Sequence, residues 1–370
     1  MSNKMKIPFY GIDRFFKAYS NDLSDIFNTV GKTGKMLMGN EIELFEKALA
    51  SFCSRKYAVT VASCTDALYF ALLSAQIKPG DEVIVPSFSF IATVTPVLQA
   101  GAVPVFTDIL PDTFSMDVKD LEKKITPKTK AIIFVPLYGA FCPIDEISHL
   151  AKLNNIALIE DNAHSLGSIS SSNVKAGTHG EISCLSFDPT KIIGGFGTAG
   201  ALLTDSEIIF KQLNKLRFQG KNTDNGKFEI LGFNSRISTL QGALLHYQLN
   251  MIDKLIERRR HIASYFNNTI DKLKNIDYVQ KTPSTFHKYV LTTSRRDDLK
   301  RFLEEKGIQT MIHYNLALFE HPLFKNYPYR AENIHTVHNI KKTILSLPIY
   351  PELTDIEVDY VSDCIQEFFK

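Results

Sequence analysis

A carboxylate and a lysine each follow an apolar stretch that has the character of a buried strand. Asp161 comes directly after Ile156–Glu160, and Lys191 lies between Ile182–Phe187 and the glycine-rich segment 192–197. An acid at the end of a buried strand is partly desolvated, so it needs a cation or hydrogen-bond donors to stay charged. A lysine in low-dielectric surroundings has a lowered pKa, and its neutral amine can attack a carbonyl. Taken singly, these residues also fit an ordinary loop aspartate and a surface lysine.

Two other segments have the chemistry to bind a phosphate and a flat ring. Ser63, Cys64 and Thr65 open a strongly helical segment, where free backbone N–H groups and the positive end of the helix dipole favour a phosphate. The same residue types are also ordinary helix caps. Phe90 follows the strand-like Glu82–Pro86, where an aromatic ring can stack on a planar ligand or belong to the core.

These four features together match the needs of pyridoxal phosphate. The phosphate needs a helix N-terminus, the pyridine nitrogen a carboxylate, the aldehyde a lysine, and the ring face a stacking partner. Each signal is weak alone, and their combination predicts a site for this cofactor. We expect no metal site, because no CxxC or comparable ligand spacing occurs.

Strands and helices alternate over residues 55–220, and this pattern must position those side chains. The expected strands are short, β-branched and bounded by glycine, proline or aspartate. Between them lie helical segments at 65–76, 117–125 and 144–154. The alternation predicts an α/β fold with a mostly parallel sheet covered by helices on both faces, whose ligands bind beyond the carboxyl ends of the strands. The expected strands are Glu82–Pro86, Val103–Ile109, Lys130–Pro136, Ile156–Glu160, Ile182–Phe187 and Gly200–Thr204.

The pattern changes after Arg236. Apolar residues from Leu240 to Ile256 predict one long amphipathic helix, which would lead to a smaller α+β domain. The expected division is a large cofactor-binding domain over residues 1–250 and a small C-terminal domain over 251–370. The basic run Arg258–Arg260 is expected to be a solvated or phosphate-facing end of a helix.

Composition narrows the class of protein. The 370 residues carry 42 Lys and Arg against 40 Asp and Glu, so no basic surface for nucleic acid is predicted. The segment between Glu82 and Asp108 has no charge, but its prolines and hydroxyl residues favour a buried strand–helix–strand unit over a membrane span. Five cysteines, Cys142 among them, form no paired spacing, and the N-terminus has no apolar leader. We therefore expect a cytoplasmic protein without a disulfide framework.

The order of motifs resembles one family along nearly the whole chain. The sequence is similar to the DegT/DnrJ/EryC1/StrS family of sugar-nucleotide aminotransferases, which has the fold-type I, aspartate aminotransferase-like architecture. The matching segments are MGNEIELFE, SCTDAL, PGDEVIVPSFSFIAT, GAVPVFTDI, EDNAHSLG, GEISCLSFDPTK, GFNSRISTLQGALL and LSLPIYPELT.

The resemblance implies roles around the cofactor ring. Lys191 looks like the lysine that binds the cofactor covalently and then moves a proton, and Asp161 looks like the partner of the pyridine nitrogen. Phe90 matches the stacking aromatic. His164 stands where the family usually has glutamine, close to the ring hydroxyl, and this departure changes the protons available there.

The resemblance also implies a phosphate site and a dimer. Cys64, Thr65 and Ser186 match phosphate-binding positions, although Cys64 replaces a glycine of the family. Asn234 matches an asparagine that reaches the phosphate from the neighbouring subunit. This match implies a homodimer with the active site at its interface.

Substrate contacts are the least specific part of the resemblance. Arg236, with Lys221, has the charge to meet a diphosphate or the donor carboxylate, and a surface role fits each equally well. Asp188 lies three residues before Lys191 and could face the sugar, while His313 and Tyr314 lie in a family-like region.

The implied activity is a pyridoxal phosphate-dependent transamination. L-glutamate would donate an amino group to a nucleotide-linked keto sugar, with a dTDP-linked 6-deoxy sugar favoured and the ketone at C3 or C4. A sugar dehydratase of the same family is one alternative, but dehydratases carry histidine in place of the cofactor-binding lysine. A non-catalytic regulator that keeps the cofactor fold is the other, and it would usually carry a DNA-binding domain.

Overall fold

The computed structural model describes residues 5–140, 143–170, 173–281 and 284–370. Cys142 lies outside these residues, and the four described cysteines, Cys53, Cys64, Cys184 and Cys364, are unpaired. None of the described helices is both long enough and apolar enough to cross a bilayer.

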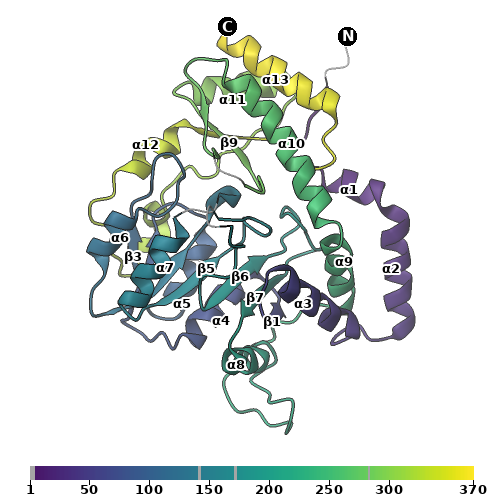
Figure 1. The fold of residues 1–370 in the computed structure, drawn as a ribbon, viewed down its shortest axis with the longest axis vertical. Helices are drawn as coiled ribbons and strands as arrows, with labels where there is room; N and C mark the ends of the chain where they lie inside the picture. Colours follow the sequence, from purple (N-terminus) through teal and green to yellow (C-terminus); the bar gives the residue numbers. More distant parts are fainter. Residues whose placement is uncertain (1–4, 141–142, 171–172, 282–283) are drawn as a thin grey trace.

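A seven-stranded sheet forms the centre of the larger part of the molecule (Figure 1). Its strand order is β1-β7-β6-β5-β4-β2-β3, and the five strands from β6 to β3 run parallel to one another. β7 pairs antiparallel with both β6 and β1. The strands are β1 (Tyr57–Val61), β2 (Glu82–Pro86), β3 (Val103–Thr107), β4 (Thr129–Phe134), β5 (Ala157–Asp161), β6 (Ile182–Ser186) and β7 (Gly200–Thr204).

Helices cover both faces of this sheet, as the apolar strand sequences predict. In β2, Val83 and Val85 pack in the apolar cluster that contains α4, whereas Ile84 between them packs in the cluster that contains α6 and α7. The helices are α1 (Ile12–Ala18), α2 (Ser20–Thr33), α3 (Asn40–Phe52), α4 (Cys64–Ser74), α5 (Thr95–Gln99), α6 (Val118–Lys124), α7 (Ile144–Leu153), α8 (Glu207–Arg217), α9 (Thr239–Leu249), α10 (Ile252–Ile270), α11 (Arg296–Glu305), α12 (Thr336–Thr343) and α13 (Asp355–Phe369). Short 3₁₀ turns span Ile91–Thr93, Leu137–Gly139, Leu318–Glu320 and Pro322–Lys325.

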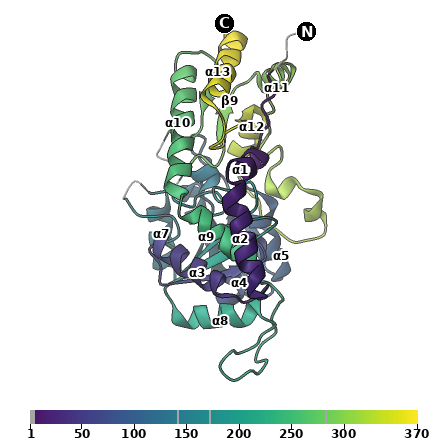
Figure 2. The same cartoon turned by 90° about the vertical axis from the view of Figure 1, so that its right-hand side faces the viewer.

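A second apolar cluster organises the C-terminal part. It joins α10, α11 and α13 to a three-stranded antiparallel sheet, and Ile7 near the N-terminus packs into it as well. Figures 1 and 2 show this unit at one end of the molecule, where the C-terminal helix α13 also lies. The strands of this sheet are β8 (Asp277–Tyr278), β9 (Tyr289–Thr292) and β10 (Ile344–Leu347).

The uncharged segment between Glu82 and Asp108 is β2, a 3₁₀ turn, α5 and β3, as expected. Its polar hydroxyls are buried at the end of β2 instead of facing lipid: Ser87 and Thr93 are almost fully inaccessible to solvent. The expected unit is therefore confirmed.

Two details of the C-terminal prediction are wrong. The long helix over 240–256 is two helices, because the α9 hydrogen-bond ladder tightens at its end, where the Met251 N–H bonds the Gln248 carbonyl at 3.1 Å. The basic run lies inside α10 and not at its end. Arg259 is only 5% exposed and donates to the backbone carbonyls of Phe286 and Ile349.

Candidate active site

A cavity of about 330 Å³ lies at the carboxyl end of the central strands. It gathers side chains from segments far apart in sequence, and every predicted site residue except Lys221, Asn234 and Arg236 lines it. The predicted residues that line it are Cys64, Thr65, Phe90, Asp161, His164, Ser186, Asp188, Lys191, His313 and Tyr314.

Asp161 is the last residue of β5 and is almost fully buried. Burial raises the pKa of its carboxyl, while hydrogen bonds from the Thr93 hydroxyl at 2.8 Å and the Ala163 N–H at 3.3 Å oppose that shift. The Thr93 hydroxyl is also within 2.8 Å of the Ser89 hydroxyl. A cation placed against this carboxylate would favour its charged form further.

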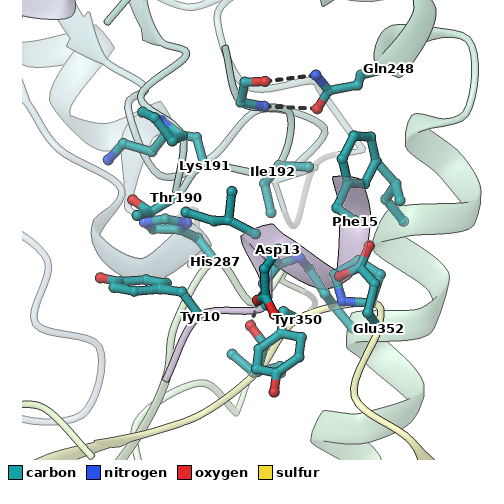
Figure 3. Close-up of a pocket in the computed structure, with 18 of the residues that line it drawn as sticks. Tyr10, Asp13, Phe15, Thr190, Lys191, Ile192, Gln248, His287, Tyr350 and Glu352 are labelled. Carbon is teal, nitrogen blue, oxygen red and sulfur yellow. Dashed lines mark hydrogen bonds between the residues drawn. The ribbon is translucent and has the colours of Figure 1, made fainter. Parts of the chain in front are cut away.

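Lys191 lies in the loop that follows β6. Its backbone N–H bonds the Asp188 carbonyl at 2.9 Å, and the Asp188 carboxylate accepts from the Thr190 N–H and hydroxyl at 3.1 and 2.8 Å. Gln248 of α9 pairs with both backbone groups of Gly194 and anchors the loop (Figure 3). Burial lowers the pKa of the Lys191 amine, so a larger share of it is neutral than in a surface lysine.

The N-terminus of α4 faces the same cavity. The Ser63 hydroxyl accepts from the Asp66 N–H at 3.1 Å, while the N–H groups of Cys64 and Thr65 have no acceptor among the described residues. Gly200 lies against this turn, since a Cβ there would come within 2.5 Å of the Ser63 backbone. Burial raises the pKa of the Cys64 thiol well above its usual value, so the thiol is protonated at neutral pH.

Two buried histidines lie beside each other in the cavity wall. The rings of His164 and His287 are 4.4 Å apart, and His164 Nδ1 accepts from the Tyr138 N–H at 3.2 Å. Burial lowers the pKa of each imidazole well below 6.5, so both are neutral. Neither ring nitrogen of His287 has a hydrogen-bond partner within the described part of the chain.

Phe90, His313 and Tyr314 form the aromatic side of the cavity. Phe90 is 54% exposed and its ring centre is 6.0 Å from that of Tyr314. His313 is held from both sides, because its carbonyl accepts from the Tyr138 hydroxyl and its Nδ1 lies 2.9 Å from the Ser346 hydroxyl. Burial, with the nearby Lys288 and Lys191, lowers the pKa of His313 to about 3.

Asn234 and Arg236 lie outside this cavity. The Arg236 guanidinium donates to the Asn234 side-chain oxygen at 2.9 Å and stacks on Phe218 at 4.3 Å. Lys221 lies over the same ring at 5.5 Å. Within one chain these residues do not line the cavity that holds Asp161 and Lys191.

Sequence reasoning did not identify Tyr10, Thr93, His287 or Lys288, although all four line the cavity and Thr93 also bonds the Asp161 carboxylate. Thr93 lies three residues after Phe90 in the uncharged segment, and that proximity was the one available signal. The other three come from the N-terminal segment and from the residues just before β9, where no local pattern connects them to the central strands.

The residues present fit pyridoxal phosphate. Free N–H groups at the start of α4 suit a phosphate, a buried carboxylate supported by a hydroxyl suits a protonated ring nitrogen, and a buried lysine lies in the same cavity. The arrangement can therefore hold a flat, phosphorylated pyridine and move protons beside it.

Comparisons with known proteins agree with this geometry. A protein named dTDP-3-amino-3,6-dideoxy-alpha-D-galactopyranose transaminase, from Aneurinibacillus thermoaerophilus, is 32% identical over 98% of this chain and 99% of its own. A protein of Geobacillus stearothermophilus named pleiotropic regulatory protein is 31% identical over 99% of both chains. The crystal structure of ntda from Bacillus subtilis, with bound cofactor PMP, matches 100% of this chain and 87% of its own at 30% identity, with a TM-score of 0.91. The sequence model of the DegT/DnrJ/EryC1/StrS aminotransferase family matches residues 19–366, and the chain therefore belongs to this family.

Proposed function

We propose that this protein is a pyridoxal phosphate-dependent aminotransferase that converts a nucleotide-linked keto sugar to the amino sugar, with L-glutamate as donor. The observation that carries the proposal is the placement of Asp161, Lys191 and the N-terminus of α4 around one cavity. Family membership and the transaminase name of a relative that matches almost end to end support it. That relative's name also favours a dTDP-linked 6-deoxy sugar.

Each side chain has a defined task in the proposed site. The N–H groups of Cys64 and Thr65, with Ser186, would hold the phosphate, and Asp161 would hold the ring nitrogen in its protonated form. Phe90 would cover one ring face, and the neutral His164 would lie near the ring hydroxyl. When bound, the cofactor supplies an aldehyde for the amine and an electron sink for the carbon that loses a proton.

Lys191 would move the proton between the two reacting carbons. Its amine must be neutral to accept a proton, and its burial lowers the pKa in the required direction. Asp161 must stay charged beside the ring, and the Thr93 hydroxyl helps to keep it so. Burial thus lowers the pKa of the Lys191 amine and raises the pKa of the Asp161 carboxyl, and the hydrogen bond from Thr93 limits the second shift.

A second copy of the chain would complete the site. We propose that Asn234 and Arg236 reach the cavity of the other subunit in a homodimer, because Asn234 is exposed, Arg236 is half-buried and neither lines its own cavity. Asp188, His313 and Tyr314 would contact the sugar from within the chain, since they line the cavity. Lys221, beside Arg236, would add positive charge for the diphosphate.

The domain division and the compartment are also proposals. Residues 1–250 would form the cofactor-binding domain and 251–370 the small domain, in line with the separate apolar cluster of the C-terminal part. The unpaired thiols among the described cysteines favour the cytoplasm, where thiols stay reduced.

Two alternatives are tested by the same experiment. The purified protein is incubated with L-glutamate and a panel of keto-sugar nucleotides, and the products are identified by mass spectrometry. An amino sugar and 2-oxoglutarate support transamination. Loss of a sugar hydroxyl without amination would support a dehydratase, against which Lys191 argues. No spectral response of the bound cofactor to L-glutamate would support a regulator, the role that the name of the Geobacillus relative suggests.

A further inference from the structure

Lys288 is a buried lysine that the proposed chemistry does not use. It lies just before β9, is 4% exposed and lines both the active-site cavity and a neighbouring cavity of about 390 Å³. Its amine donates to the Tyr10 hydroxyl at 3.1 Å and lies 4.4 Å from the centre of that ring and 5.4 Å from the ring of Phe9. Two aromatic faces therefore border the ammonium group.

No carboxylate of the described residues forms an ion pair with Lys288. Burial lowers the pKa of its amine, the charges of Lys191 and Arg259 lower it further, and only Asp188 opposes them. The Asp188 carboxylate is already bonded to Thr190. This environment favours the neutral amine in the free protein, and an anionic ligand beside it would favour the charged form.

The position of Lys288 connects it to the reacting group. Lys191, Thr190, His287 and Tyr10 line the same two cavities and form the wall that they share. Figure 3 shows Tyr10, His287 and Thr190 side by side on this wall, with the Lys191 amine directed away from Phe15 and Tyr350. An anion bound at Lys288 would therefore share the cavity with Lys191, the residue proposed to move the proton of the donor.

The two substrates differ in where they carry negative charge. In an amino acid donor, the α-carboxylate is attached directly to the carbon that bears the amine. In a nucleotide-linked sugar, the neighbours of the reacting carbon are neutral, and the diphosphate is several bonds away. A cation next to Lys191 thus matches the donor and not the acceptor.

We propose that Lys288 binds the α-carboxylate of the amino donor. This inference rests on the proposed transamination, and it assigns the donor half of that reaction to a residue of the C-terminal part of the chain. Burial of an unpaired lysine lowers the stability of the free protein, so the residue trades stability for donor affinity.

The test compares the holoenzyme with Lys288→Met and with Lys272→Met, a control at an exposed lysine. Binding of glutarate, an unreactive dicarboxylate, is measured by titration calorimetry. Binding of L-glutamate and of 4-aminobutyrate, which lacks the α-carboxylate, is followed through the absorbance of the bound cofactor. We expect Lys288→Met to weaken glutarate and L-glutamate by at least about tenfold, and wild type to bind 4-aminobutyrate at least about tenfold more weakly than L-glutamate.

Other outcomes would overturn the assignment. They are unchanged glutarate binding in Lys288→Met, a weakened acceptor with an unchanged donor, or equal affinity of wild type for L-glutamate and 4-aminobutyrate. The melting temperature of Lys288→Met should equal or exceed that of wild type, and a lower value with normal donor binding would show a structural role. If no keto sugar is aminated, the proposed acceptor fails, while the donor measurements still decide the role of Lys288.

Discussion

Replacing Thr93 with valine tests how the protein keeps Asp161 charged. Valine has nearly the shape of threonine but cannot donate the 2.8 Å hydrogen bond to the Asp161 carboxylate. This bond favours the charged form, and burial already raises the pKa of Asp161. Its loss therefore raises that pKa further.

The size of the effect follows from the charge of the acceptor. A hydrogen bond to a charged group is worth about 1.5–3 kcal/mol, which corresponds to about one to two pKa units at about 1.4 kcal/mol per unit. Asp161 acts as a carboxylate, so activity is lost as the pH falls through its pKa. The acid limb of the pH profile should consequently move to higher pH by about one unit or more in Thr93→Val.

The assay is the rate of the half-reaction with L-glutamate, followed by cofactor absorbance between about pH 5 and 9, where the acid limb is accessible. Ser89→Ala removes the hydroxyl that lies 2.8 Å from the Thr93 hydroxyl and does not itself bond Asp161. It should therefore shift the acid limb by less than Thr93→Val does. Thr95→Val is the control, because its side chain lies outside the cavity. An acid limb of Thr93→Val that coincides with that of wild type would refute the reasoning.

Four further predictions follow from the same contacts. Lys191→Ala should lower turnover by at least about a thousandfold and remove the visible absorbance of the bound cofactor, and normal turnover would contradict its role. His164→Gln should leave the acid limb in place, because burial already keeps this imidazole neutral, and a displaced limb would show that it titrates. Glu46→Ala leaves the buried Arg217 without its ion-pair partner and should lower the unfolding free energy in urea by about 3–5 kcal/mol, whereas less than about 1 kcal/mol would mean that the pair is screened. Gly200→Ala pushes a Cβ against Ser63 and should weaken cofactor binding by at least about tenfold, measured by dialysis and absorbance, and unchanged affinity would show that the α4 turn yields.

Local patterns were sufficient for the strands and for the residues that follow them. Asp161 and Lys191 each come after an apolar run, and the carboxyl ends of neighbouring parallel strands meet at one edge of a sheet. The same logic located Cys64 and Phe90, because each follows its own strand. A residue that follows a parallel strand in the sequence is thus expected at that edge of the sheet.

Local patterns did not predict where a helix ends or how deeply a side chain is buried when tertiary packing decides these properties. The apolar residues from Leu240 to Ile256 continue the helical period through the break at Met251, so the sequence carries no sign of it. Arg259 appeared as part of a basic run, but in the fold its guanidinium reaches two backbone carbonyls and is buried.

By itself, the sequence determined the α/β class, the family resemblance and the strand-end half of the candidate site. Those features depend on the periodicity of neighbouring residues and on short motifs. Only the tertiary structure decided that Tyr10, His287 and Lys288 join the same cavity, as Lys288 and Tyr10 are 278 positions apart in sequence and 3.1 Å apart in space. The physical reason is that the burial of a side chain and the compensation of its charge depend on all of its neighbours in space. The residue types along one segment do not show which residues those neighbours are.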